Sequence, residues 1–130
     1  MSYPGNRIIL CLGSNVEKER NMECAVHLLR THFISIRFSA PMLTEPINCN
    51  SAESFLNQVA VLYSDQDIDS IKAILKQIER SLGRKPEDKI KGLIPIDIDL
   101  LQFNETVLKP ADLSRDYVIK GLQSLSDLSV

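Results

Sequence analysis

Hydrophobic and polar residues recur along this chain with two different periods, and the changes of period predict its elements. Residues 7–12 form a continuous apolar run, which is typical of a central strand covered on both faces. Apolar residues three or four apart predict two amphipathic helices, and alternation predicts the other strands. The expected order is a strand at 7–12, a helix at 17–33, strands at 34–43 and 55–63, a helix at 69–82 and a strand at 95–101.

Turns and less regular segments separate these elements. Gly13, Ser14 and Asn15 suit a turn from strand to helix, because they favour turns and helix caps. Residues 44–53 predict a polar loop, and the basic segment 84–93 predicts a mobile loop. Two weaker elements follow, a short strand at 106–108 and a mixed, partly helical segment at 113–128.

The order strand, helix, strand, strand, helix, strand is that of a ferredoxin-like α+β sandwich. It predicts an antiparallel four-stranded core sheet with both helices on one face. A length of 130 residues suits one hydrophobic core, so we expect residues 1–130 to form a single domain. No internal repeat or low-complexity segment interrupts this pattern.

The composition is that of a soluble globular protein, with 44% hydrophobic and 25% charged residues. No apolar run approaches the ~20 residues of a membrane span, and residues 1–12 lack the features of a signal peptide. We therefore expect a cytoplasmic protein. A net charge of −2 gives no overall basic footprint for nucleic acid. The three cysteines lack paired metal-ligand spacing, and Cys11 fits the core of a strand.

The segment with the most distinctive chemistry is the last long strand. Ile96, Ile98 and Leu100 point to one face, and Asp97 and Asp99 point to the other, about 7 Å apart. Two carboxylates on one face repel each other unless a positive group lies between them. A hard cation such as Mg²⁺ fits, because it binds one or two carboxylates together with substrate phosphates. A solvated sheet face carrying two charges is the alternative interpretation.

The run from Lys91 to Leu101 resembles the signature of the 6-hydroxymethyl-7,8-dihydropterin pyrophosphokinase family, in which a Gly-Pro-Arg segment leads into an Asp-x-Asp strand. Four further pieces resemble family segments in the same order. They are Gly13-Ser14-Asn15, Thr44-Glu45-Pro46, Phe55-Leu56-Asn57, and Ile78-Glu79 with Gly83-Arg84. The order and spacing of the five pieces carry the resemblance, because each piece alone is weak.

The resemblance implies the ferredoxin-like fold and the transfer of pyrophosphate from ATP to the hydroxymethyl group of a reduced pterin in folate biosynthesis, with release of AMP. By the same resemblance, Asp97 and Asp99 hold two Mg²⁺ ions, and Arg84 joins them as a catalytic residue. Such transfer depends mainly on positioning and charge neutralisation. The implied partners are pterin and ATP, without nucleic acid or membrane, and the implied state is a monomer or weak dimer.

The resemblance also implies residues for both substrates. The pterin-binding set is Thr44, Ile47, Phe55 and Asn57, and the nucleotide-binding set is Arg84, Ser114, Tyr117 and Lys120. The amide of Asn57 offers a donor and an acceptor to a ring edge. From the residues alone, a plain core position is the better interpretation of Phe55, and a solvated surface fits Lys120 at least as well as a nucleotide contact.

The chain departs from the family pattern where phosphate would bind. Ile94 stands at the Arg position of the signature and Leu93 at its Pro position. Pro86 replaces a second basic residue, and Asp116 stands where the family has a His that contacts ATP. Arginine gives phosphate a bidentate, permanently charged contact, whereas isoleucine gives none. The nearby basic residues that could compensate are Lys85, Lys89, Lys91 and Arg115.

Three interpretations follow. The chain is an active, divergent pterin pyrophosphokinase, a binding module with little transfer activity, or a relative that acts on another phosphate substrate. Retention of Asp97, Asp99, Asn57 and Phe55 favours a working site, whereas the lost basic residues favour weak catalysis. We expect the first.

Overall fold

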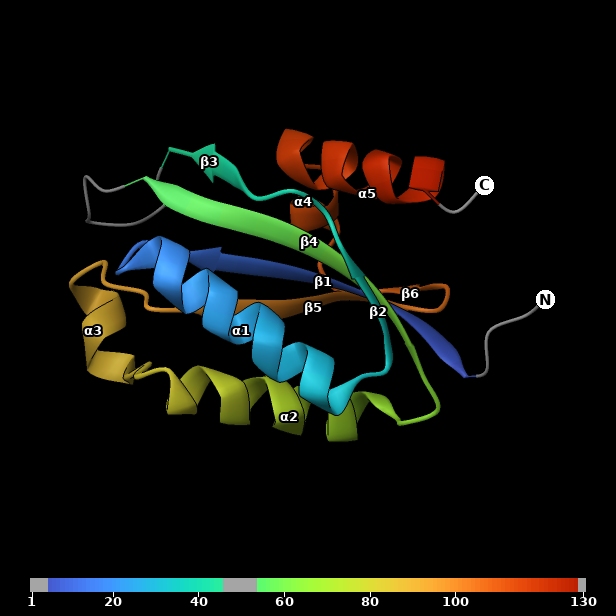
Figure 1. The fold of residues 1–130 in the computed structure, drawn as a ribbon, viewed down its shortest axis with the longest axis horizontal. Helices are drawn as coiled ribbons and strands as arrows, with labels where there is room; N and C mark the ends of the chain where they lie inside the picture. The colour runs from blue at the N-terminus through green and yellow to red at the C-terminus, as the bar shows by residue number, and fades with distance from the viewer. Residues whose placement is uncertain (1–4, 46–53, 129–130) are drawn as a thin grey trace.

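The computed structural model describes residues 5–45 and 54–128 of the chain. Figure 1 shows long helices packed on both sides of a twisted sheet. The elements in chain order are β1 (Asn6–Ser14), α1 (Lys18–His32), β2 (Ser35–Phe38), β3 (Met42–Thr44), β4 (Phe55–Ser64), α2 (Ile68–Ser81), α3 (Pro86–Ile90), β5 (Asp97–Phe103), β6 (Thr106–Val107), α4 (Pro110–Leu113) and α5 (Asp116–Leu128).

The strands form one antiparallel sheet in the order β2-β4-β1-β5-β6, and β3 also pairs with β4. β1 lies between β4 and β5, where its continuous apolar run is covered on both faces. The predicted antiparallel α+β fold is therefore confirmed, with the six-stranded sheet and helices of a ferredoxin-like protein.

The predicted strand 34–43 is in fact two strands, β2 and β3, which both pair with β4. From Phe38 to Met42 the chain advances four residues, whereas β4 advances three over the same span. The extra residue makes a bulge, and Pro41, which has no amide hydrogen for the ladder, lies within it. The interruption redirects the chain so that Thr44 pairs with β4 at the edge of the sheet.

α1 and α2 pack on one face of the sheet, as predicted (Figure 1). Their fully or largely buried apolar side chains include Met22, Ala25 and Leu29 of α1 and Ile71, Leu75 and Ile78 of α2. These side chains join those of β1, β4 and β5 in the larger core cluster. Asp67 caps α2, because its carboxylate accepts a hydrogen bond from the Ser70 amide at 2.8 Å.

The opposite face of the sheet is covered by α5, which follows the short α4 (Figure 1). The buried residues of this second cluster are Ile9, Val59, Val61, Leu101, Val118 and Leu125. The prediction placed helices on one face only, so the fold has an additional layer. The physical reason is that β1, β4 and β5 carry apolar side chains on both faces, and the second face also has to be removed from water.

Other boundaries also differ from the predictions. The basic segment contains the short helix α3, and Pro86 suits its first position because no helical hydrogen bond is lost there. β1 continues through Ser14, so the turn begins at Asn15. The predicted strand at 106–108 is β6. Among the described residues, no helix is long and apolar enough to cross a membrane.

Gly121 allows α5 to approach β4 closely. A Cβ atom at this position would lie 2.8 Å from Cγ2 of Val59 and 3.0 Å from its Cβ. We expect Gly121→Val to lower the free energy of unfolding by about 1–3 kcal/mol, because the helix would have to move away from the sheet. Urea unfolding measures the change, and Gln123→Val on the exposed side of α5 is the control. Equal losses in the two variants would contradict the close contact.

Candidate active site

The site residues meet in rows across the three central strands. Gly13 of β1 pairs with Asn57 of β4 on one side and with Asp97 of β5 on the other. In the next row, Cys11 pairs with Val59 and with Asp99. Residues paired across strands project to the same face, here the face covered by α5. Because Gly13 has no side chain, β1 places none between Asn57 and Asp97 in this row.

Three of the predicted pterin residues lie together at one end of this row. Asn57 is only 5% exposed, and its Nδ2 donates to Oγ1 of Thr44 at 2.6 Å. Phe55 pairs with Thr44 across β3 and β4. A Cβ on Gly13 would lie 3.4 Å from Oδ1 of Asn57 and 3.7 Å from Cδ2 of Phe55. These side chains therefore border the position above Gly13. The fourth residue, Ile47, lies outside the described residues.

Asp97 and Asp99 each contact a basic side chain. Asp97 forms an ion pair with Arg84, and Oδ1 of Asp99 accepts a hydrogen bond from Nζ of Lys109 at 3.0 Å. Burial would raise the pKa of Asp97, but the hydrogen bond and charge of Arg84 outweigh it, and this pKa lies below its ordinary value. Burial and the charge of Asp97 raise the pKa of Asp99, which Lys109 offsets only in part. The carboxylate pair thus has two resident cations.

A buried carboxylate holds Arg84 beside Asp97. Glu79 of α2 is 4% exposed, and its Oε2 accepts hydrogen bonds from the Ile98 amide at 2.7 Å and from Nη1 of Arg84 at 3.2 Å. Arg84 also donates to the carbonyl of Ile96 at 3.3 Å. The guanidinium therefore links the end of α2 to the start of β5. Sequence reasoning did not assign Glu79 to the site, although a carboxylate within the apolar stripe of a helix signals a buried ion pair.

The ionisation of Glu79 gives stability a definite pH dependence. Burial raises its pKa, although the Ile98 hydrogen bond and the charge of Arg84 lower it in part. Because the folded protein holds this proton more tightly than the unfolded chain, the contribution of Glu79 to stability falls as the pH rises from its ordinary value of 4.5 through the raised pKa. Glu79→Gln lacks this component. We expect urea unfolding to show that the wild type loses stability relative to Glu79→Gln as the pH rises across that range. A stability difference that does not change with pH would contradict the raised pKa of Glu79.

Asn15 fixes the loop that carries the altered signature. Its Nδ2 donates to the carbonyl of Gly92 at 2.7 Å, and its Oδ1 accepts from the amide of Ile94 at 2.7 Å. Its own amide donates to the carbonyl of Ile94 at 2.9 Å. The backbone at Ile94 is thus held on both sides, directly before β5. Leu93, the neighbouring departure from the family pattern, is 42% exposed.

The C-terminal residues of the predicted nucleotide set do not all reach the carboxylates. Tyr117 is half-buried, and its hydroxyl lies 4.0 Å from Sγ of Cys11, in the row beside Asp99. Burial raises the pKa of Cys11 to about 12, so its thiol is neutral. Ser114 is exposed, and its hydroxyl donates to the carbonyl of Ala111 at 2.8 Å. Lys120 is exposed on α5. In the described part of the chain, no contact joins Ser114 or Lys120 to the carboxylate pair.

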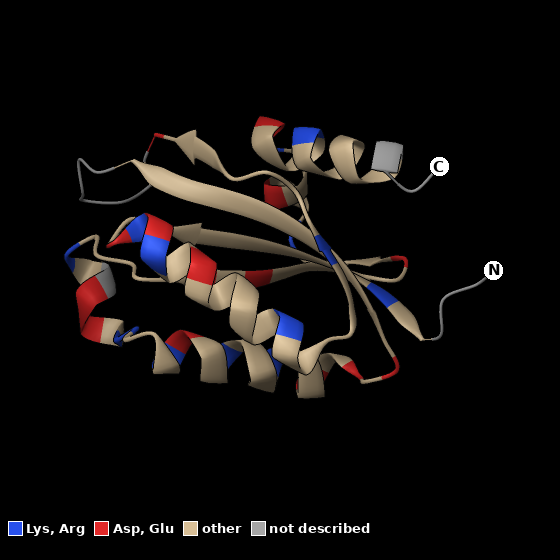
Figure 2. Cartoon of the chain, in the orientation of Figure 1, with Lys and Arg blue, Asp and Glu red and all other residues tan. Residues whose placement is uncertain are grey.

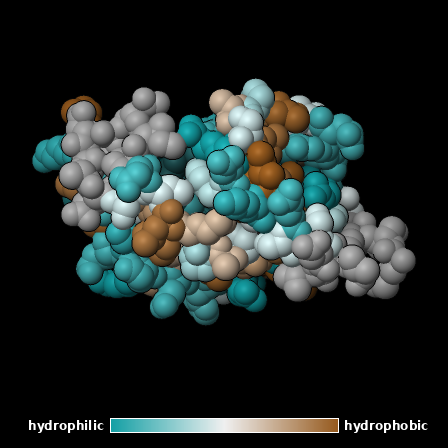
Figure 3. Space-filling model, turned by 90° about the horizontal axis from the view of Figure 1, so that it is seen from above, coloured by the Kyte–Doolittle hydropathy of each residue, from teal (hydrophilic) through white to brown (hydrophobic). Residues whose placement is uncertain are grey.

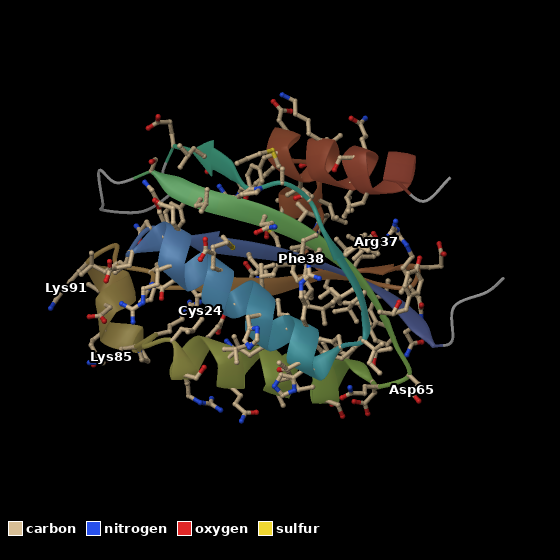
Figure 4. The ribbon with its side chains drawn as sticks, in the orientation of Figure 1. Cys24, Arg37, Phe38, Asp65, Lys85 and Lys91 are labelled. Carbon is tan, nitrogen blue, oxygen red and sulfur yellow. The ribbon has the colours of Figure 1, made fainter. Side chains whose placement is uncertain are left out.

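The basic residues expected to compensate lie elsewhere. Lys85 and Lys91 are exposed at the two ends of α3, as Figure 4 shows, and Figure 2 shows acidic residues between them. Arg115 is engaged by Asp112 at 3.0 Å. The side chain of Lys89 is outside the described residues. Lys109, which sequence reasoning did not single out, is the lysine in contact with Asp99.

A separate groove lies on the opposite side of the sheet from these residues. It has a volume of about 330 Å³ and is lined mainly by α1 and β4, including Met22, Val26, Leu56 and Gln58. Leu56 and Gln58 alternate with Asn57 along β4 and so face the other way. Figure 3 shows the molecule from above, where apolar areas are broken up by hydrophilic ones; Leu43 and Ile119 are exposed large hydrophobic residues of the chain. The groove does not contribute to the carboxylate site.

The fold and the site define the class: a ferredoxin-like α+β protein with a carboxylate pair on a central strand of its sheet. The family model for 7,8-dihydro-6-hydroxymethylpterin-pyrophosphokinase (HPPK) matches residues 9–127. The chain belongs to this family.

Individual relatives agree with the family match. The chain is 27% identical over 113 residues to the 2-amino-4-hydroxy-6-hydroxymethyldihydropteridine pyrophosphokinase of Helicobacter pylori, which covers 84% of this chain and 69% of that protein. It is 29% identical over 100 residues to the folate synthesis bifunctional protein of Arabidopsis thaliana, covering 75% of this chain and 21% of the relative. It is also 29% identical over 103 residues to a mitochondrial bifunctional protein of the same plant, of which it spans 18%.

The donor set of the site suits a hard cation. The described residues contain no group of three or more His, Cys, Asp or Glu side chains that could hold a metal ion. Mg²⁺ nevertheless needs only one or two carboxylates when substrate phosphates complete its shell. Asp97 and Asp99 meet that requirement, since both lie on one face of β5 and both are ionisable oxygen donors. Their resident cations, Arg84 and Lys109, would have to yield to the metal.

Proposed function

We propose that this chain transfers pyrophosphate from ATP to the hydroxymethyl group of 6-hydroxymethyl-7,8-dihydropterin, releasing AMP, as a single domain of residues 1–130. Membership of the HPPK family supports the class of reaction. The observation that carries the proposal is the row of Asn57, Gly13 and Asp97. On one face of the sheet, this row holds an amide that can pair with a ring and a carboxylate that can serve a phosphate, and Gly13 is the β1 residue between them.

In this proposal the pterin ring lies over Gly13. Asn57 meets the edge of the ring, and Phe55 lies beside it. The hydrogen bond from Nδ2 of Asn57 to Thr44 supports the assignment, because it fixes the amide with Oδ1 beside Gly13, where a ring N–H would meet an acceptor. Ile47 completes the pocket by family resemblance.

The triphosphate lies on the side of the carboxylate pair. Asp97 and Asp99 hold Mg²⁺, which supplies neutralisation of the phosphate charge when bound. Arg84, fixed by Glu79, presents a guanidinium next to Asp97. Tyr117 forms part of the wall beside Cys11, and Ser114 and Lys120 belong to the outer nucleotide site by resemblance alone.

The transfer is balanced without a further reactant. The hydroxymethyl oxygen of the pterin forms a bond to the β-phosphorus of ATP. The bond between that phosphorus and the oxygen bridging to the α-phosphate breaks, AMP leaves with that oxygen, and the hydroxyl proton passes to solvent. Positioning and charge neutralisation are the main contributions of the protein.

A binding module with little transfer activity is the second candidate. It is favoured by Ile94 and Asp116, which remove positive charge from the phosphate side. The test is AMP release from ATP by the purified chain with Mg²⁺, in the presence and absence of 6-hydroxymethyl-7,8-dihydropterin. Release that depends on the pterin supports transfer. Binding of both ligands by calorimetry without AMP release supports the module instead.

Asn57 is expected to be essential for pterin affinity. Removing the amide leaves the ring edge without its partner, and an unsatisfied polar group costs ~1–3 kcal/mol. Asn57→Ala should therefore weaken binding of a pterin analogue by roughly ten- to a hundredfold in calorimetry. The matched control is Gln58→Ala, which removes the neighbouring amide on the other face of β4. Comparable affinity for wild type and Asn57→Ala would exclude this contact.

A further inference from the structure

The carboxylate pair does not stand alone but belongs to a set of three adjacent ion pairs. They are Asp97 with Arg84, Asp99 with Lys109, and Asp112 with Arg115. Arg84 is shared with the buried Glu79, so it is not available to Asp97 alone. The side chain of Lys109 is 47% exposed and that of Asp99 is 32% exposed. This pair is therefore open to solvent and to a ligand from one side, and its ammonium keeps donor capacity beyond Asp99.

The hairpin of β5 and β6 fixes the position of Lys109. The carbonyl of Leu101 accepts hydrogen bonds from the amide of Leu108 at 2.9 Å and from that of Lys109 at 3.2 Å. Pro110 then begins α4, with its φ fixed by the ring. The backbone of Lys109 is thus tethered to the strand that carries Asp99, and its side chain reaches back along that strand. The contact is a consequence of the fold rather than of a flexible surface lysine.

We propose that Lys109 is the counter-ion of Asp99 in the nucleotide-free protein and a phosphate ligand of this chain in its complex with Mg²⁺ and nucleotide. This inference rests on the proposed function, because it concerns the same site. A cation that takes Asp99 displaces the ammonium, which stays within reach because its backbone is tethered to β5. Phosphates held by that cation are then next to the displaced ammonium. Lys109 in this way replaces charge that Ile94 and Asp116 do not provide.

Two observations favour Lys109 over the other basic residues. Arg115 is already paired with Asp112, and Lys85 and Lys91 flank α3, where they are exposed. Lys109, by contrast, places its ammonium 3.0 Å from Oδ1 of Asp99, and its side chain is 47% exposed. An ammonium donor next to a carboxylate that can hold Mg²⁺ is suited to a phosphate oxygen.

The proposal predicts opposite effects on two affinities. Lys109→Met removes the cation that competes for Asp99, so affinity for Mg²⁺ alone should rise severalfold. The same variant removes a charge-assisted contact to phosphate, so affinity for the Mg²⁺ complex of α,β-methylene-ATP should fall about tenfold or more. Calorimetry with MgCl₂, and then with this analogue, measures both. A residue with a merely structural role would change both affinities in the same direction or neither.

Two further variants make the result specific. Lys72→Met removes an exposed lysine from α2, the helix that packs on the opposite face of the sheet. This variant should leave both affinities unchanged. Lys109→Arg keeps the charge and should retain most of the nucleotide affinity. Thermal unfolding without ligand should show that Lys109→Met is folded. Parallel changes, or no change, in the two affinities of Lys109→Met would overturn the inference.

The same experiment separates this inference from the proposed function. A wild type that binds the Mg²⁺–nucleotide complex, with the opposite shifts in Lys109→Met, supports the role of Lys109 whether or not AMP is released with pterin. Absence of AMP release alone contradicts only the proposed transfer. A wild type that does not bind the Mg²⁺–nucleotide complex contradicts both.

Discussion

Asp97→Asn and Asp99→Asn are each expected to lower pterin-dependent AMP release by about a hundredfold or more. A bound metal stabilises the developing phosphate charge by several kcal/mol, and each 1.36 kcal/mol corresponds to a factor of ten in rate. Asparagine keeps nearly the shape of aspartate but removes the charge that attracts Mg²⁺ and the second strong oxygen donor. The substitutions therefore test the electrostatic role of the carboxylates rather than their packing.

The two substitutions should differ in their side effects. Asp97 is the partner of Arg84, which is also paired with buried Glu79, so Asp97→Asn leaves the guanidinium with one of its two carboxylates. Asp99→Asn instead leaves Lys109 without its partner. Both variants should be compared with Asp65→Asn, which changes an exposed residue at the far end of the molecule (Figure 4). Retention of AMP release and of Mg²⁺-dependent nucleotide binding in both variants would show that the carboxylate role is wrong.

The architecture of the two-helix face followed from sequence because periodicity reports burial directly. Leu75 and Ile78 of α2, for example, are buried as their spacing predicts. The third layer was harder to predict, because Gly121 interrupts the apolar pattern of α5 and glycine is a poor helix former. In the folded protein this glycine favours the packing of α5, because it allows the helix to lie close to Val59.

The site shows the same division between local and long-range information. The resemblance of short motifs identified Asn57 and Asp97 as candidate site residues. They lie on one face of the sheet because Gly13 pairs with both. That row depends on the register of three strands that lie far apart in the sequence, and the short motifs do not specify this register. Lys109 was missed for a related reason. Its contact with Asp99 arises because the hairpin between β5 and β6 turns the chain back along the strand.

Restoring the family residues at the phosphate side is expected to raise activity substantially. The double change Ile94→Arg with Asp116→His adds a permanent cation and removes an acidic group. A charge-assisted hydrogen bond contributes ~1.5–3 kcal/mol, so we expect kcat/KM for AMP release to increase by roughly ten- to a hundredfold. The backbone at residue 94 is held by Asn15 on both its amide and carbonyl, and Pro95 favours an extended conformation before it. The new side chain should therefore not require the loop to be rebuilt.

The size of this gain depends on Lys109. If Lys109 already contacts phosphate, the double change should increase kcat/KM more in a Lys109→Met background than in wild type, because the new arginine then replaces a missing contact. Ile34→Arg with Asp65→Asn, which adds the same formal charge at two exposed positions, is the control for net charge. The measurement is AMP release at fixed Mg²⁺ in the four combinations of wild type, double change and Lys109→Met. If the double change lowers AMP release in both the wild-type and the Lys109→Met background, Ile94 and Asp116 do not weaken the phosphate site, and its cations are already sufficient.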